Sequence, residues 1–133
     1  KSITTFSSPV ASDELIQLVR EAIAKAREAS VIGADKFRKE HPEAEHIPFS
    51  FGYANIYCIS AQSPVISALK ALHENDEISV TFLGDSGCQI NGIIAGATKW
   101  QSIYEAEAAA ESAVSVLKEF LSEAEFSVES RLD

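Results

Sequence analysis

The chain has 133 residues, the usual length of one domain, and its shares of hydrophobic residues (46%) and charged residues (23%) are ordinary for a globular protein. Asp and Glu total 20 against 11 Lys and Arg, which gives a net charge of −9 at pH 7. Because this charge repels phosphate backbones and anionic lipids, it argues against nucleic acid and membranes as partners.

The sequence lacks the features of a membrane or secreted protein. No stretch approaches the roughly 18 consecutive apolar residues of a transmembrane helix, and residues 1–11 lack the apolar run of an intact signal peptide. The two cysteines, Cys58 and Cys88, are too few for a disulfide scaffold, and no evident basic neighbour activates them. We therefore expect a cytoplasmic protein in which both are free, buried thiols.

In the first half of the chain, Ser/Thr-rich residues 1–11 are expected to form a flexible lead-in. Ser12 is a good helix N-cap, and apolar residues at spacings of three and four predict a helix to about Ser30. Gly33 is expected to end or bend it, before a further turn or two. Aromatic and β-branched residues predict a strand over residues 49–59.

In the second half, Ser63-Pro64 suits the start of another helix. Residues 77–83 and 88–97 alternate between apolar and polar side chains, which predicts a β-hairpin. Ser102 and Glu105 fit a capping box for a last helix over residues 103–126.

These elements predict an α+β fold in the order α-β-α-β-β-α. It would be a single domain over residues 12–126, followed by a flexible tail over 127–133. Its small three-stranded sheet would include a C-terminal β-hairpin and be packed by helices on one face. Leu117 lies in the middle of the apolar stripe of the last helix and is the predicted core residue there.

Two short motifs suggest chemistry that their context does not support. Gly-Asp-Ser-Gly at 84–87 looks like the segment around the nucleophile of trypsin-like proteases, but the chain is too short and helical for that double barrel, and a tight turn explains these residues. A loop carries His41, Glu43, Glu45 and His46, which are residue types that bind zinc. Their spacing matches no helical ligand pair, so the sequence predicts no catalytic residue, no metal and no cofactor.

A polar set of side chains on the predicted strands is the first candidate for binding. The set consists of Tyr53, Asn55, Tyr57, Gln89 and Asn91, joined by Ser79 and Thr81 if the strand registers align. Such a face is either solvated, or it binds a protein partner or a small polar ligand. Exposed tyrosines are good contact residues, which favours binding.

Acidic residues dominate the end of the chain, where eight acids stand against two bases from Gln101 to Asp133. Four of them are predicted to form an acidic docking surface, namely Glu107, Glu111, Glu119 and Glu123. Such a surface would steer a basic partner in a salt-sensitive way. The alternative is that these acids only keep the protein soluble.

The Gln101-Ser102 pair and the Ala- and Glu-rich helix of residues 105–121 close a strand-helix-hairpin unit. This order resembles small uncharacterised α+β proteins encoded by tailed bacteriophages and prophages, over Phe49 to Leu121. The tryptophans associated with the hairpin in that group are missing, and Trp100 is the single tryptophan here. The resemblance implies no activity and no site residues, but it favours a phage or mobile-element accessory protein.

On these grounds we expect a non-enzymatic, acidic interaction or accessory protein that docks a protein partner or a second copy of itself. The alternative is a small-ligand-binding domain that uses the polar, tyrosine-bearing face of the sheet. An enzyme using Cys58 or the His41–His46 loop is a third hypothesis, and the sequence offers no catalytic constellation for it.

Overall fold

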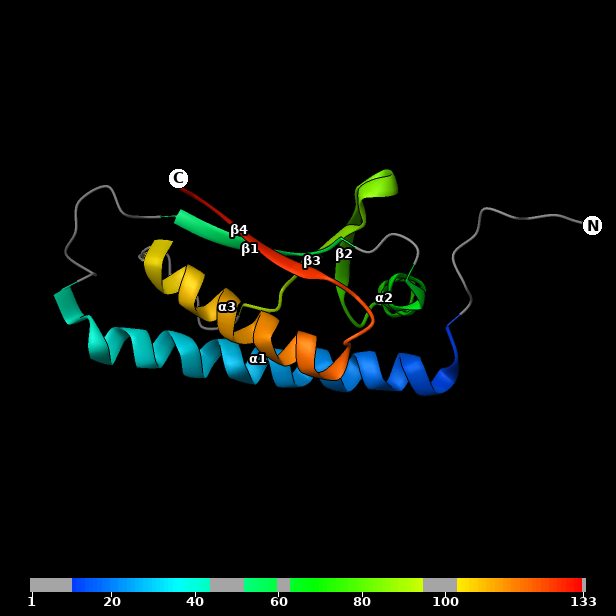
Figure 1. Cartoon of the computed structure of the whole chain (residues 1–133), viewed down its shortest axis with the longest axis horizontal. Helices are drawn as coiled ribbons and strands as arrows, with labels where there is room; N and C mark the ends of the chain where they lie inside the picture. The colour runs from blue at the N-terminus through cyan, green and yellow to red at the C-terminus, as the bar shows by residue number, and fades with distance from the viewer. Residues whose placement is uncertain (1–10, 44–51, 60–62, 95–102, 133) are drawn as a thin grey trace, which may run out of the picture.

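A computed structural model of the protein describes residues 11–43, 52–59, 63–94 and 103–132 (Figure 1). Within these ranges the chain forms three α-helices and one antiparallel sheet of four strands, so the predicted α+β class is confirmed. In chain order the elements are α1 (Asp13–Glu40), β1 (Gly52–Cys58), α2 (Pro64–Glu74), β2 (Ser79–Phe82), the short 3-10 turn η2 (Gly84–Ser86), β3 (Cys88–Asn91), α3 (Ile103–Phe120) and β4 (Phe126–Leu132).

The strands lie in the order β2-β3-β1-β4, and neighbouring strands are antiparallel throughout. From β1 onward the succession β-α-β-β-α-β is that of the ferredoxin-like, or split βαβ, arrangement. Helix α1 precedes this unit. Because such arrangements carry many unrelated functions, the topology alone does not identify an activity.

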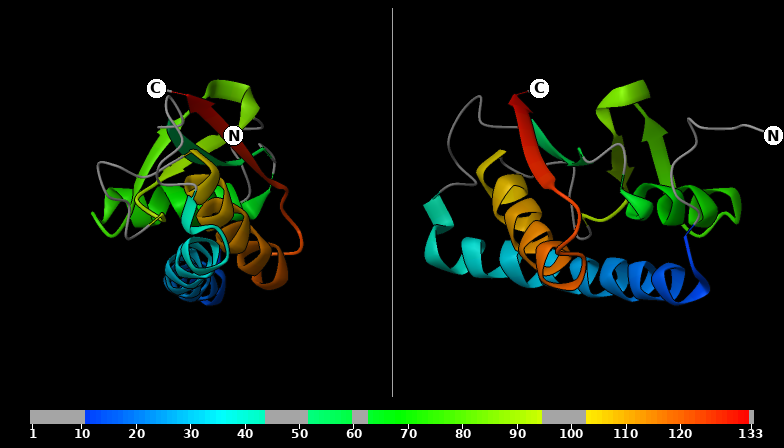
Figure 2. Two further views of the ribbon diagram at one scale, coloured as in Figure 1. Left: turned by 90° about the vertical axis from the view of Figure 1, so that its left-hand side faces the viewer. Right: turned by 45° about the vertical axis from the view of Figure 1, so that its right-hand side comes forward.

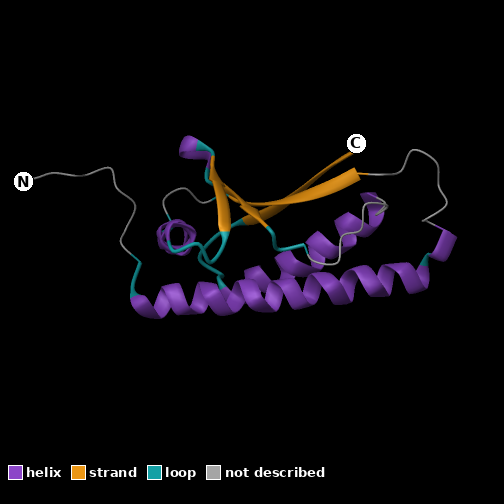
Figure 3. Cartoon of the chain, turned by 180° about the vertical axis from the view of Figure 1, so that it is seen from behind, coloured by secondary structure: helices purple, strands orange, loops and turns teal. Residues whose placement is uncertain are grey.

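The helices cover one face of the sheet in two layers (Figures 1 and 3). Helix α3 packs against β1 and β4, α2 lies beside β2, and α1 runs beneath both helices with its most extensive contact along α3. Apolar side chains from the helices and the sheet fill the space between these layers. The largest fully buried ones include Ile23, Ile56, Leu69, Leu72 and Leu117, so the core position predicted for Leu117 is confirmed.

The hairpin of β2 and β3 forms as the sequence predicts, with Phe82 opposite Cys88. Its turn has φ angles of 64° at Gly84 and 103° at Gly87, which glycine adopts without steric cost. A Cβ at Gly87 would also lie 2.0 Å from the carbonyl oxygen of Cys58, so close approach to β1 requires glycine there. Strand β3 ends at Asn91, and the predicted end at residue 97 lies outside the described residues.

Helix α1 corrects the prediction that the first helix ends near Ser30 or bends at Gly33. It continues without interruption from Asp13 to Glu40. A Cβ at Gly33 would lie 2.2 Å from the Oγ of Ser112 on α3, so the glycine allows α1 and α3 to approach closely. Packing against α3 therefore outweighs the cost of about 1 kcal/mol for glycine inside a helix.

The predictions of a three-stranded sheet, a last helix to residue 126 and a flexible tail are wrong, because the end of the chain forms strand β4. Helix α3 ends at Phe120, and residues 126–132 form a strand that pairs with β1 over its whole length, from Cys58↔Phe126 to Gly52↔Leu132. Phe126 is buried at 5% exposure and Val128 packs against the core, while Ser127 and Glu129 alternate with them. The sheet thus has four strands and the element order is α-β-α-β-β-α-β.

Cys58 and Cys88 stand opposite each other on β1 and β3, and both are fully buried, as predicted. Burial, together with the neighbouring Cys58, raises the pKa of the Cys88 thiol to about 12. Because the thiolate is the reactive form of cysteine, Cys88 is unsuited to nucleophilic chemistry at neutral pH.

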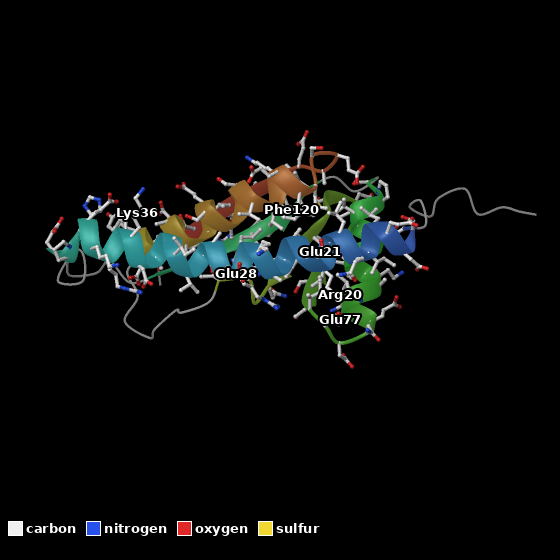
Figure 4. The ribbon with its side chains drawn as sticks, turned by 90° about the horizontal axis from the view of Figure 1, so that it is seen from below. Arg20, Glu21, Glu28, Lys36, Glu77 and Phe120 are labelled. Carbon is white, nitrogen blue, oxygen red and sulfur yellow. The ribbon has the colours of Figure 1, made fainter. Side chains whose placement is uncertain are left out.

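A bidentate ion pair joins α1 to the segment before β2 (Figure 4). The Nε and Nη2 groups of Arg20 donate to the two carboxylate oxygens of Glu77 at 2.6 and 2.8 Å. Hydrogen bonds from Arg20 and Asn75 lower the pKa of the Glu77 carboxyl from 4.5 to about 2. This shift makes the stability of the fold depend on pH in the acid range.

We expect the protein to lose stability as the pH falls from 4.5 towards 2. The pKa of Glu77 is lower in the folded state, so its contribution is present above the unfolded-state value and is lost as the carboxyl becomes protonated. Denaturant unfolding at several pH values in this window should show that the free energy of unfolding falls less steeply with pH for Glu77→Gln than for the unmodified chain. Glu74→Gln removes a nearby exposed carboxylate and should keep the original response, and equal slopes for both variants would contradict the prediction.

Candidate functional site

The face of the sheet opposite the helices carries polar side chains on all four strands. Strand register places Thr81, Gln89, Tyr57 and Ser127 opposite one another in one row. In the adjacent row Ser79 stands opposite Asn91, and Asn55 stands opposite Glu129. We call this surface the open face.

Period-two alternation explains why these side chains share the open face. Val80, Ile90 and Ile56 occupy the positions between them and are buried against the helices at 5%, 4% and 1% exposure. Successive side chains of a strand point to opposite faces, so the intervening polar residues point away from the core. They are half-buried or exposed, as expected for a sheet face that the described helices leave uncovered.

A chain of hydrogen bonds links the open face across β1, β3 and β2. The Nε2 group of Gln89 donates to the Oδ1 atoms of Asn55 at 3.3 Å and Asn91 at 2.8 Å. The Nδ2 group of Asn91 in turn donates to the hydroxyl oxygens of Ser79 at 3.3 Å and Thr81 at 3.1 Å. We call these five residues the amide network.

The amide network holds neutral donors and acceptors in fixed positions. A primary amide has two N–H donors and one carbonyl acceptor. Gln89 uses its amide nitrogen for two bonds, and among the hydrogen bonds of the described residues none engages its Oε1 atom. The arrangement therefore presents oriented, uncharged hydrogen-bonding groups, which suit recognition better than proton transfer or nucleophilic attack.

The structure thus brings together three of the five predicted binding residues, Asn55, Gln89 and Asn91, in direct contact. Tyr57 stands beside them, opposite Gln89 and half-buried. The backbone of Tyr53 pairs with Arg131 on β4, and its side chain lies outside the described part of the structure. Ser79 and Thr81 join the network because the hairpin register aligns them with β3.

The predicted acidic docking surface is not one cluster. Glu107 is half-buried and accepts a hydrogen bond from the Ser130 hydroxyl at 3.0 Å. Glu111 and Glu119 are exposed on α3, but eight residues of helix separate them by about 12 Å. That distance exceeds the screening length of roughly 8 Å at physiological salt. Glu123 is exposed beyond the end of α3.

One buried acid has a role that the sequence pattern did not reveal. Glu105, predicted as part of a capping box, has a side chain only 6% exposed and accepts a hydrogen bond from the Arg38 Nη1 group at 2.7 Å. Burial opposes the charge of Arg38, but the hydrogen bonds and opposite charges of Glu105 and Asp35 together outweigh it, so the pKa of Arg38 is raised. Because 67 residues separate the two, no local pattern predicts the pair. Ser102, the other half of the predicted box, lies outside the described residues.

The hollow that adjoins the open face is too small for most ligands. It has a volume of about 110 Å³ and lies at the end of β3, where Asn55, Asn91 and Gly92 line it together with the apolar residues around them. Pockets that bury small molecules usually measure about 300–1,000 Å³. The size of this hollow therefore favours a broad contact surface over a pocket.

The motifs that suggested chemistry form no site in the described ranges. Residues 84–86 form the exposed end of the hairpin, and Gly87 is buried against β1. The Nδ1 atom of His41 lies 3.6 Å from Glu43, while Glu45 and His46 lie outside the described residues. In the part of the chain that the structure describes, no group of three metal-ligating side chains comes together, and no helix is long and apolar enough to span a membrane.

Comparison with known proteins does not assign the chain to a family. No protein-family model matches it, and the searches of curated proteins and of solved structures gave no significant match. The resemblance to phage and prophage proteins therefore stays a prediction, and the open face is the candidate site that the geometry itself defines.

Proposed function

We propose that this protein is a non-enzymatic binding protein that docks a protein partner on the open face of its sheet. The observation that carries the proposal is the amide network, in which Gln89 joins Asn55 to Asn91 and Asn91 joins Ser79 and Thr81. A solvated face does not require its amides to be aligned with one another, whereas a recognition surface gains affinity when its polar groups are preorganised.

The chemistry of the open face favours a protein over other partners. Its neutral amides and hydroxyls match the peptide groups and polar side chains of a protein surface, and Tyr57 adds an aromatic contact. The net charge of −9 opposes nucleic acid. A cytoplasmic accessory protein, encoded by a phage or mobile element, is the role that we propose for such a module.

The test is capture of partners by the immobilised chain and by Asn55→Ala/Gln89→Ala. Loss of two side chains of the amide network is expected to weaken the binding of a true partner about tenfold. Gln17→Ala, which removes an exposed glutamine side chain from α1, is the matched control and should retain the partner. Equal capture by all three proteins would show that the open face does not bind it.

Salt separates this proposal from docking through the acidic residues. Contacts between neutral groups persist at about 1 M salt, where the Debye length falls to roughly 3 Å. A partner held by Glu107, Glu111, Glu119 and Glu123 would instead be released by salt, and its association would slow when these residues become Gln. A small polar ligand, the second candidate, would raise the melting temperature of the unmodified chain and leave that of Asn55→Ala/Gln89→Ala unchanged.

A further inference from the structure

The two edges of the sheet differ in length. The β2 edge has four residues, whereas the β4 edge has seven and contains neither proline nor glycine. No strand of the described residues pairs with the outer side of β4, which lies at the margin of the sheet in Figure 2. A long, regular edge is a template for pairing with another strand unless it is blocked.

The hydrogen-bond pattern identifies which residues of β4 offer their backbone groups at this edge. The amide of Ile59 donates to the carbonyl of Glu125 at 2.9 Å, one step beyond the Cys58↔Phe126 pair. Because hydrogen-bonded pairs alternate along an antiparallel ladder, Ser127, Glu129 and Arg131 direct their backbone groups at β1. The backbone groups of Phe126, Val128, Ser130 and Leu132 therefore point outward.

We propose that the outer edge of β4 pairs with the same edge of a second copy of this chain, antiparallel, around a twofold axis at Ser130. Two four-stranded sheets would then join into one sheet of eight strands. An axis at Ser130 places Ser130 opposite itself and Val128 opposite Leu132 of the second copy. Residues whose backbone groups point outward then face one another, as the hydrogen bonds between the two strands require. This interface leaves the amide network outside it, so it does not depend on the function proposed above.

Charge complementarity supports a second copy of this chain as the occupant. Glu129 and Arg131 form an exposed ion pair at 2.9 Å within one chain, on the open face. An axis at Ser130 also places Glu129 opposite Arg131 of the second copy and Arg131 opposite its Glu129, so the two pairs would form one network of four alternating charges. Opposite charges directly across a ladder are stabilising, and like charges are destabilising. An axis at Glu129 would place that carboxylate opposite itself, and an axis at Arg131 would oppose two guanidinium groups.

The first test blocks the edge without disturbing the bonds between β4 and β1. In Ser130→Pro the outward N–H is removed, a change that edge strands tolerate on their solvent side. Ser130→Ala removes the same hydroxyl and keeps the N–H, so it is the matched control. Sedimentation should show a concentration-dependent species of twice 14.4 kDa for the unmodified chain and Ser130→Ala, but only the single-chain mass for Ser130→Pro.

The second test reverses charges. Glu129→Arg and Arg131→Glu each oppose like charges and should be monomeric, whereas the double variant restores both pairs and should recover the dimer. An axis at Val128 would place Arg131 opposite Glu125, and the double variant would then stay monomeric. Circular dichroism and thermal unfolding of each variant separate loss of pairing from loss of fold.

The third readout concerns Glu107, which accepts from the Ser130 hydroxyl at 3.0 Å. The axis at Ser130 brings the Glu107 carboxylates of the two copies towards each other, so Glu107→Gln is expected to strengthen association. An unmodified chain that stays monomeric up to millimolar concentration, a dimer that survives Ser130→Pro, or a double charge reversal that fails to recover association would overturn the proposal.

Discussion

Replacing Leu117 with Ala is expected to lower the free energy of unfolding by about 2–5 kcal/mol. Leu117 has no exposed surface and belongs to the core between the sheet, α3 and α1. Its loss removes apolar contacts and leaves a cavity, since a core bounded by a sheet and two helices relaxes only partly. Urea unfolding of both proteins, monitored by circular dichroism, measures the change.

Leu83→Ala is the matched control, because it is the same substitution at a side chain that is 41% exposed. It is expected to cost about 1 kcal/mol or less. If Leu117→Ala changed the free energy by less than about 0.5 kcal/mol, which is typical of surface sites, the packing of α3 described above would be wrong.

Replacing Arg38 with Met is expected to lower the free energy of unfolding by about 3 kcal/mol. The substitution removes the guanidinium group that lies 2.7 Å from the carboxylate of Glu105, while that carboxylate stays buried at 6% exposure. Breaking one side of a buried ion pair is costly because the remaining charge has lost its solvation and its counter-charge. Because the side chain of Arg38 is 34% exposed, we place the cost at the lower end of the range for such pairs.

A second variant separates the charge effect from loss of packing. Arg38→Met/Glu105→Leu replaces both partners by apolar side chains and is expected to recover most of the lost stability. Lys39→Met removes a neighbouring exposed cation and should change the free energy by about 0.5 kcal/mol or less. If Arg38→Met were as stable as the unmodified chain, the pair would not help to hold α1 against α3.

Local patterns in the sequence determined the elements whose signals lie within a few residues. Ser12 and Ser63 cap α1 and α2 through hydrogen bonds to amides two or three residues further on. The alternation around Ile90 predicted a hairpin with one polar face, and that face carries Asn91 and Gln89 as expected. The apolar stripe of α3 likewise identified Leu117 as a core residue.

Contacts between distant segments decided the rest. From the sequence, Gly33 is predicted to end or bend the helix. In the fold α3 lies against it, and the missing side chain lets α1 and α3 approach closely. The segment 126–132 is short and carries two charges, so its sequence alone is typical of a tail. It forms a strand because the edge of β1 supplies hydrogen bonds along its whole length. Glu105 is predicted from the sequence to be part of a local helix cap. In the fold it accepts a hydrogen bond from Arg38, which is 67 residues away in the chain.

For the candidate site, the sequence determined the residue types and the tertiary structure decided which of them touch. Alternation on single strands predicted Asn55, Gln89 and Asn91 as polar positions, but alternation carries no information about the register between strands. A slip by one residue would have moved each of these side chains to the other face. The register of β1, β2 and β3 is set by burial of Ile56, Val80 and Ile90 beneath them, and the amide network follows from that register.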